Sequence, residues 1–267
     1  MQEQFRLDGK VIIVTGGGRG LGRGMAHALA AAGAKVMISA RTKEQLDRTV
    51  QEIRDAGGVA SSFAGDMTDS AQVNAMVDAC VAEYGGLDVC FANAGIGGGT
   101  DAEFWEYPDW AFEDVLGRNL KSNFYTCRAA AKVMVEQGRG GVLVLTSSAG
   151  GHRASKRWAY ATAKGGVLSL TKVLSGMLAG HGIRVNSISP GIVAQNDPVD
   201  EQDAARRAQQ GTFVPANRVG AWWEMGPLAV WLASDASSYV TGTDIAIDGG
   251  MMNAGLAPVS YRPQHEI

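Results

Sequence analysis

Cysteine and proline are scarce in this chain of 267 residues, which has three of the first and seven of the second. The cysteines, Cys80, Cys90 and Cys127, are odd in number, widely spaced and form no CxxC pair. We therefore expect neither a disulfide framework nor a metal site, and a reducing cytoplasm as the natural setting. The few prolines, together with 46% hydrophobic residues, exclude a disordered or collagen-like chain and allow one large core.

The chain also lacks an excess of charge of one sign and long apolar runs. The 24 basic residues nearly balance the 27 acidic ones, which leaves no electrostatic footprint for nucleic acid or an anionic membrane. No apolar run approaches the roughly 18 residues that span a bilayer, and the opening MQEQFRLDGK lacks the apolar core of a secretory signal. We expect a cytoplasmic protein that binds neither nucleic acid nor membranes.

Glycine, by contrast, is in excess: there are 36, about twice the average usage of roughly 7%. Many of these glycines follow short apolar runs that alternate with longer segments of helical spacing. The runs predicted as strands are residues 11–14, 35–40, 59–64, 87–92, 141–147, 183–189 and 244–247. This alternation predicts a single α/β domain over residues 1–267. Its fold would be a doubly wound, mostly parallel Rossmann-type sheet with helices on both faces.

Three longer segments complete this organisation. A long helix is predicted over residues 108–137 and another over 222–232. Residues 194–215 are polar and charged without a strand pattern, and loops longer than about 12–15 residues are usually functional. We predict a substrate lid there, with charges paired at i,i+3 or i,i+4 on a solvated helix face. Residues 251–267 are predicted to be an irregular C-terminal tail.

The glycine cluster TGGGRGLG (residues 15–22) lies between the first predicted strand and the first helix. A doubly wound sheet binds pyrophosphate at this place, because glycines let the backbone approach a phosphate and the helix N-terminus presents free N–H groups. The spacing is TGxxxGxG rather than GxGxxG, and no GKS or GKT follows, so a Walker-type NTPase loop is not supported. A glycine-rich turn without a ligand is the alternative.

The end of the second predicted strand indicates which dinucleotide is bound. An acidic residue there would bind the ribose 2′-hydroxyl of NAD, but the sequence is ISART and has none. Arg41 in this segment and Arg19 in the glycine turn would instead bind the 2′-phosphate of NADP. We predict a preference for NADP(H), with NAD(H) as the second candidate; a solvated Arg41 is the alternative interpretation.

Tyr160 and Lys164, in the segment YATAK, lie four residues apart and therefore on one face of a predicted helix. A free tyrosine, with a pKa near 10, is ionised in only about one molecule in a thousand at pH 7. A nearby ammonium favours the phenolate, so Lys164 is expected to lower the pKa of Tyr160 and make it a competent acid/base. Because a tyrosine and a lysine often occur at this spacing by chance, the pair indicates a catalytic site only in combination with the glycine cluster.

In combination these motifs resemble the short-chain dehydrogenase/reductase family over about residues 7–250. The matching segments are TGGGRGLG, GDMTD around Asp66, the Asn93–Gly95 triplet, Asn119, Ser147, YATAK, Pro190-Gly191 and LASDASSYVTGTDIAIDGG. The resemblance implies an oxidoreductase that transfers a hydride between NADP(H) and a secondary alcohol or ketone.

The same resemblance implies a role for each site residue. Tyr160 would be the acid/base, Lys164 would hold the nicotinamide ribose, and Ser147, preferred to its neighbour Ser148, would bind the substrate oxygen. Asn119 would hold a water that relays protons. The implied cofactor-binding residues are Gly16, Gly18, Arg19, Gly20, Leu21, Gly22, Arg41, Asp66, Met67, Asn93, Ala94, Gly95, Tyr160, Lys164, Pro190, Gly191 and Val193. One position departs from the pattern: Gln195 stands where the family often has threonine, which leaves the contacts of this loop open.

The substrate is left open by the sequence. Phe104, Trp105 and Trp158 indicate an apolar or aromatic partner, or else packing and subunit contacts, and His152 either touches the substrate or lies at the surface. A second interpretation is an NAD-dependent polyol, sugar or steroid dehydrogenase with the same residues. A third is a non-catalytic dinucleotide sensor or scaffold. The presence of all four catalytic residues argues against it, because a protein that only binds a dinucleotide has no chemical need for them. The resemblance also implies a homotetramer or dimer acting on a small alcohol or ketone.

Overall fold

The computed structural model describes residues 2–153 and 155–253 and contains one parallel sheet of seven strands in the order β3-β2-β1-β4-β5-β6-β7. The strands are β1 (Val11–Thr15), β2 (Lys35–Ala40), β3 (Val59–Ala64), β4 (Val89–Ala92), β5 (Gly141–Thr146), β6 (Ile183–Pro190) and β7 (Asp244–Ile247). The prediction of a doubly wound parallel sheet is confirmed. The winding reverses between β1 and β4, the position where such sheets bind their ligands.

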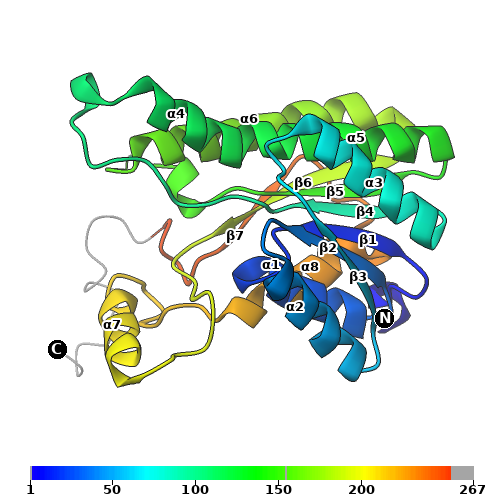
Figure 1. Cartoon of the computed structure of the whole chain (residues 1–267), viewed down its shortest axis with the longest axis horizontal. Helices are drawn as coiled ribbons and strands as arrows, with labels where there is room; N and C mark the ends of the chain where they lie inside the picture. The colour runs from blue at the N-terminus through cyan, green and yellow to red at the C-terminus, as the bar shows by residue number, and fades with distance from the viewer. Residues whose placement is uncertain (1, 154, 254–267) are drawn as a thin grey trace.

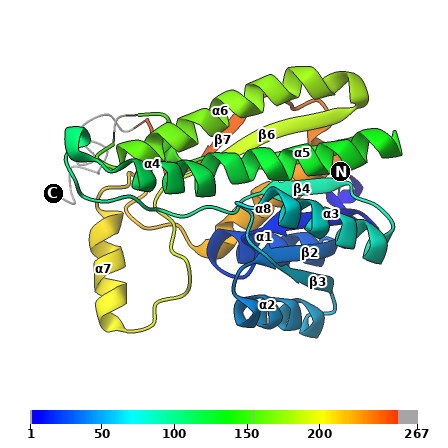
Figure 2. The same ribbon diagram turned by 45° about the horizontal axis from the view of Figure 1, so that its top comes forward.

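Helices cover both faces of the sheet (Figures 1 and 2). On one face lie α1 (Gly20–Ala31), α2 (Lys43–Asp55) and α8 (Met225–Ala233). On the other lie α3 (Ser70–Tyr84), α5 (Ser122–Gln137) and α6 (Trp158–Leu178). Each face therefore has its own hydrophobic core. Strands between two such layers are buried on both sides, which explains why they are continuous apolar runs in the sequence.

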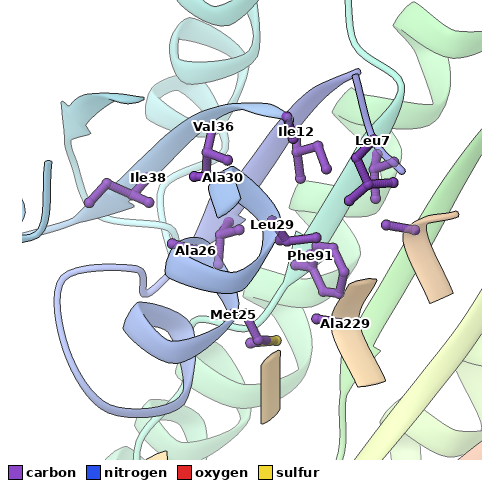
Figure 3. Close-up of a cluster of buried hydrophobic side chains, with 14 of the residues drawn as sticks. Leu7, Ile12, Met25, Ala26, Leu29, Ala30, Val36, Ile38, Phe91 and Ala229 are labelled. Atoms are coloured by element: carbon purple, nitrogen blue, oxygen red, sulfur yellow. The ribbon is translucent and has the colours of Figure 1, made fainter. Parts of the chain in front are cut away.

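The core beneath α1 illustrates this packing (Figure 3). Met25 and Leu29 of α1 lie over Ile12 of β1 and Phe91 of β4, and Ala229 of α8 closes the layer. All five side chains are almost completely buried. Full burial of a side chain of this size stabilises a fold by roughly 1.5–3 kcal/mol. The first turn of α1 is thereby held firmly at the carboxyl end of β1.

Residues 108–137, predicted as one helix, form two helices joined by a turn of π-helix. The helices are α4 (Asp109–Leu116) and α5, and the π-turn covers Gly117–Lys121. Inside the turn the Asn119 side chain donates to the main-chain oxygen of Val115 at 3.0 Å, and Asn123 donates to that of Asn119 at 2.8 Å. Side-chain amides that compete for helix carbonyls in this way account for the interruption.

One strand and one helix also begin two or more residues later than predicted. The strand expected from residue 87 begins at Val89, because both main-chain polar groups of Leu87 bond to the side-chain amide of Gln137 at 2.8–2.9 Å. The helix expected over 222–232 starts with one 3-10 turn, Trp222–Glu224, and becomes α-helical in α8.

The predicted lid contains a helix, α7 (Glu201–Gly211), that stands apart from the sheet beyond the end of β6 (Figure 1). Asp203 forms ion pairs with Arg206 and, at 2.5 Å, with Arg207, which confirms the expected i,i+3 and i,i+4 pairs. Of the predicted tail, 254–267 lies outside the described residues, and 251–253 form a turn. In the described part of the chain, no helix is long and apolar enough to cross a membrane.

Candidate active site

The carboxyl ends of the central strands open into a cavity of about 1020 Å³. This volume is at the upper end of the roughly 300–1,000 Å³ that ligand pockets occupy. Every site residue predicted from the sequence lines the cavity except Gly20 and Asn119. Those two lie directly behind its wall, Gly20 beneath Gln195 and Asn119 beneath Gly95. The structure thus brings together residues that lie between Gly16 and Gln210 in the sequence.

The glycine turn forms the floor of the cavity at the start of α1. Gly16 has φ +69°, and a Cβ atom on Gly22 would lie 2.2 Å from the main-chain oxygen of Gly16. The residue before the helix, Arg19, makes no capping hydrogen bond with its side chain, so the first N–H groups of α1 have no side-chain cap. Free helix N–H groups beside a close backbone approach bind phosphate. The residues present therefore fit the pyrophosphate of a dinucleotide.

Thr15 joins this turn to the neighbouring strand, a role that the sequence analysis missed. Its hydroxyl donates to the main-chain oxygen of Phe91 at 3.2 Å and accepts from the N–H groups of Asn93 and Ala94, both at 2.9 Å. The Asn93 side chain donates to the Thr15 main-chain oxygen at 2.9 Å. The segment Asn93–Gly95 is thereby held against the glycine turn. A hydroxyl residue at the end of a buried strand, just before the glycines, was the available signal.

The far end of the cavity carries Arg19, Arg41 and Asp66. Burial by itself raises the pKa of Asp66, but two hydrogen bonds from Thr68 and the charges of Arg41 and Arg118 bring this pKa below its ordinary value. Asp66 is therefore an ionised acceptor at neutral pH. Both arginines are exposed, and within the described residues neither forms an ion pair. Two free guanidiniums on one wall suit an anionic group.

At the other end, Lys164 of α6 is buried with 3% of its surface exposed. Its ammonium donates to the main-chain oxygen of Thr146 at 2.7 Å, and the Ser147 hydroxyl donates to the main-chain oxygen of Lys164 at 2.9 Å. Burial lowers the pKa of Lys164 to about 8. The end of β5 and the first turns of α6 are thus held together by the residues expected to be catalytic.

The pKa of Tyr160 corrects one expectation from the sequence. Burial raises this pKa above its ordinary value, and a hydrogen bond with Ser148 and the charge of Arg157 offset that effect only in part. The expectation that Lys164 lowers the pKa is wrong for this structure. The ammonium is bonded to Thr146 and lies 5.6 Å from the centre of the Tyr160 ring. Tyr160 is therefore a protonated hydroxyl at neutral pH.

Asn119 lies at the back of this catalytic end. Its side-chain nitrogen donates to the main-chain oxygens of Ile96 and Val115 at 2.9 and 3.0 Å. Its Oδ1 atom is buried and accepts no hydrogen bond from the described residues. A Cβ atom on Gly95 would lie 2.8 Å from this oxygen and 3.4 Å from the Lys164 ammonium. A buried acceptor left open beside an ammonium suits a bound water.

Phe104, Trp105, Trp158 and His152 are not among the described residues that line the cavity, and Trp105 is exposed at the surface. Trp158 packs against Phe104, Tyr107 and Phe112 with ring centres 4.6–5.6 Å apart, so this aromatic cluster is packing rather than cavity wall. The Nε2 atom of His152 lies 2.9 Å from Oδ2 of Asp244.

The cavity wall also contains residues that the sequence analysis did not name. They include Thr42, Gln45, Arg118, Arg157, Ile192 and Gln210. Arg157 could have been predicted from the sequence, because a residue three positions before Tyr160 lies close to Tyr160 at the start of a helix. The others depend on how distant loops meet, for which the sequence has no local pattern.

Comparisons with known proteins agree with this geometry. A sequence model of the family described as enoyl-(acyl carrier protein) reductase matches residues 16–252. The chain is 37% identical to 3beta-hydroxysteroid dehydrogenase 1 of Eggerthella lenta, over 92% of this chain and 94% of the relative. It is also 37% identical to 2-dehydro-3-deoxy-D-gluconate 5-dehydrogenase of Escherichia coli, over 93% and 97%.

Among solved structures, a short-chain type dehydrogenase/reductase from Mycobacterium marinum has a similar fold. It superposes with a TM-score of 0.86 at 38% identity, covering 93% of this chain and 98% of that one. Family, fold and cavity are therefore consistent with one another. The chain belongs to the short-chain dehydrogenase/reductase family, NAD(P)-dependent oxidoreductases that act on CH–OH groups.

Proposed function

We propose that this protein is an NADP(H)-dependent dehydrogenase or reductase of secondary alcohols and ketones. The observation that carries the proposal is the cavity itself, with Tyr160, Ser147 and Lys164 at one end and Arg19 and Arg41 at the other. The first group suits proton handling at a reacting oxygen. The second suits the phosphate that distinguishes NADP from NAD.

The cofactor-binding role rests on several features of the wall. The uncapped start of α1 would hold the pyrophosphate, Asp66 would accept from the adenine amino group, and Met67 would lie beside it. Lys164 would hold the nicotinamide ribose, with the segment from Pro190 to Val193 at the carboxamide. When bound, NADP(H) supplies or accepts the hydride.

The protein's own residues would handle the proton. In reduction, Tyr160 donates its proton to the oxygen of the ketone; in oxidation it takes the proton from the hydroxyl. Its raised pKa keeps the proton in place at neutral pH, which favours the acid role. Ser147 would turn from the Lys164 main-chain oxygen to donate to the same substrate oxygen. Ser148, already bonded to Tyr160, is the second candidate for this contact.

The next step in the proton path would involve Asn119. The open Oδ1 atom of Asn119 lies beside Lys164, behind Gly95. A water bound there would connect the ammonium to solvent and replace the proton that Tyr160 gives up. This arrangement supports a path from solvent through Asn119 and Lys164 to Tyr160.

A substrate screen tests the proposal. Purified protein would be supplied with NADPH or NADH and a panel of ketones, and with the oxidised cofactors and the matching alcohols, while the absorbance of the reduced cofactor is followed. We expect turnover with a larger kcat/KM for NADPH than for NADH. A larger value for NADH would favour the NAD-dependent polyol, sugar or steroid dehydrogenase. Tight NADPH binding without turnover across the panel would contradict the proposal.

We further propose one catalytic domain in a cytoplasmic homo-oligomer, with residues 194–215 as a lid. Large apolar side chains are exposed on the outer sides of α5 and α6, namely Phe124, Val135, Val173 and Met177. Exposed apolar side chains mark interfaces between proteins where they gather into one patch. Sedimentation at micromolar concentration would test it: a tetramer or dimer is expected, and a monomer would contradict the proposal.

A further inference from the structure

We propose that Arg157 binds an anionic group on the substrate, so that the preferred alcohol or ketone carries a carboxylate or a phosphate ester. The inference rests on the proposed function and narrows its substrate class. Arg157 lines the cavity at its catalytic end, next to Ser148 and Tyr160. It comes directly before α6, three residues ahead of Tyr160.

One distance and one electrostatic effect indicate where the guanidinium lies. Its Nη1 atom lies 3.4 Å from the position that a Cβ atom on Gly97 would take. Its positive charge also acts on the Tyr160 hydroxyl. The guanidinium therefore lies between the loop that follows β4 and the start of α6. A substrate whose oxygen contacts Tyr160 would extend past this group.

The other charged groups of the cavity are already engaged. Arg118 pairs with Asp114 at 2.6 Å, Lys164 donates to Thr146, and Asp66 accepts two hydrogen bonds from Thr68. Arg19 and Arg41 belong to the opposite, adenosine end of the cavity.

Among the described charged residues at the catalytic end, Arg157 is the one without a side-chain partner. Its side chain forms no hydrogen bond and no ion pair with any residue in the described ranges 2–153 and 155–253, and its main-chain N–H donates to Ser155. Among the described residues that line the cavity, Asp66 is the only acidic one, and it lies at the far end. Within the described part of the chain, the catalytic end therefore carries an exposed positive charge on the cavity wall that no acidic side chain neutralises.

The chemistry of the guanidinium narrows the partner further. Its five N–H donors form a planar fork that matches the two oxygens of a carboxylate or phosphate. The helix that begins beside it, α6, is 21 residues long and has no side-chain cap at its start, so its partial positive charge acts in the same direction. A neutral substrate would leave both positive groups without a counter-charge.

Matched pairs of compounds test the inference. The pairs are acetoacetate with its methyl ester, levulinate with its methyl ester, and dihydroxyacetone phosphate with dihydroxyacetone. The variants are Arg157→Gln and, as a matched control, Arg153→Gln. The control removes one charge from the same loop, but its guanidinium donates to the main-chain oxygen of Met251 and does not line the cavity.

We expect at least one charged member to exceed its neutral partner about tenfold or more in kcat/KM, in wild type and in Arg153→Gln. In Arg157→Gln this advantage should fall by about 10- to 100-fold, mostly through KM, as expected for loss of a charge-assisted contact. Loss of the effect of Arg157 on the pKa of Tyr160 changes both members of a pair alike, so the ratio of kcat/KM within each pair measures the anion contact alone. A preference confined to the carboxylic acids or to the phosphate ester shows which of the two anionic groups the site binds. Preference for the neutral members, or an advantage that survives in Arg157→Gln, would overturn the inference.

Calorimetry separates this inference from the proposed function. The charged compounds would be titrated into the Tyr160→Phe variant saturated with NADPH, with and without Arg157→Gln. Absence of turnover with every compound would count against the proposed function alone. Heat of binding that disappears with Arg157→Gln would still support the anion site, and absence of binding by every charged compound would overturn it.

Discussion

Oε1 of Gln195 lies over the Cα atom of Gly20, so near that a Cβ atom on Gly20 would be 1.9 Å from it. Gly20 is the first residue of α1 and has φ +54°, and Gln195 follows β6 at the start of the lid segment. The contact joins the lid segment to the turn proposed to bind pyrophosphate. It also shows how Gln195 is accommodated where the family often has threonine: the glycine leaves room for the longer side chain.

This contact predicts that Gly20→Ala weakens NADPH binding. The new methyl group would collide with Gln195, and alanine is strained at a positive φ by roughly 1–2 kcal/mol. The turn would relieve this strain and the collision by moving away from its phosphate-binding position. We therefore expect the Kd for NADPH, measured by cofactor fluorescence, to rise about tenfold, which corresponds to about 1.4 kcal/mol of binding free energy.

Two further variants serve as controls for Gly20→Ala. Gly176→Ala, in α6, should leave the Kd unchanged, because its Cβ would meet no atom within 4 Å. Adding Gln195→Ala to Gly20→Ala should restore part of the affinity, because the collision is removed while the φ strain remains. An unchanged Kd in Gly20→Ala would contradict the role of this contact.

Tyr160→Phe should reduce kcat by several orders of magnitude and leave NADPH affinity largely intact. The variant removes only the hydroxyl that exchanges a proton with the substrate, and general acid–base catalysis contributes about 10²–10⁴-fold. Steady-state kinetics and fluorescence titration measure the two quantities separately. Tyr239→Phe is the control, because that side chain is fully exposed. Turnover near that of the wild type in Tyr160→Phe would refute the assignment.

Arg41→Ala should lower kcat/KM for NADPH by about 10- to 100-fold, because a charge-assisted contact with the 2′-phosphate is lost. The value for NADH should change little, since NADH carries no such phosphate. Arg48→Ala is the matched control: Arg48 is an exposed arginine of α2 that lies 4.0 Å from Glu52. If the values for NADPH and NADH fall together in Arg41→Ala, the preference for NADP is wrong.

The buried ammonium of Lys164 predicts how stability depends on pH. Its pKa is lowered from 10.5 to about 8, so between these values the unfolded chain holds a proton that the folded protein has lost. Stability therefore rises with pH across this window. Below about pH 8 both states are charged, and the lysine makes no pH-dependent contribution.

Denaturant unfolding of wild type and Lys164→Met at pH 7.5 and pH 10 measures this effect. The wild type should gain about 2–3 kcal/mol relative to the variant, at about 1.4 kcal/mol for each tenfold change in proton affinity. Burial also shifts the pKa values of the three cysteines. Both proteins contain these cysteines, so their contribution to the pH dependence cancels in the comparison. An identical change with pH in both proteins would contradict the lowered pKa.

Much of the fold could be predicted because its signals are local. The strands are buried on both faces, so each appears as an apolar run, as in residues 35–40 and 59–64, where the observed bounds agree with the prediction. The glycines mark where the chain turns at the ends of these strands. The π-turn at Asn119 could not be predicted, because it depends on which carbonyl groups two asparagine side chains reach.

The sequence by itself determined the family, the parallel sheet and many of the residues that line the cavity, because motif spacing and hydrophobic period are properties of short segments. The tertiary structure alone decided their electrostatic states and the neighbours they meet. Burial raises the pKa of Tyr160, which Lys164 was expected to lower, and Arg157 lines the cavity without a side-chain partner among the described residues. Burial and charge pairing depend on segments distant in sequence, and these come together only in the folded chain.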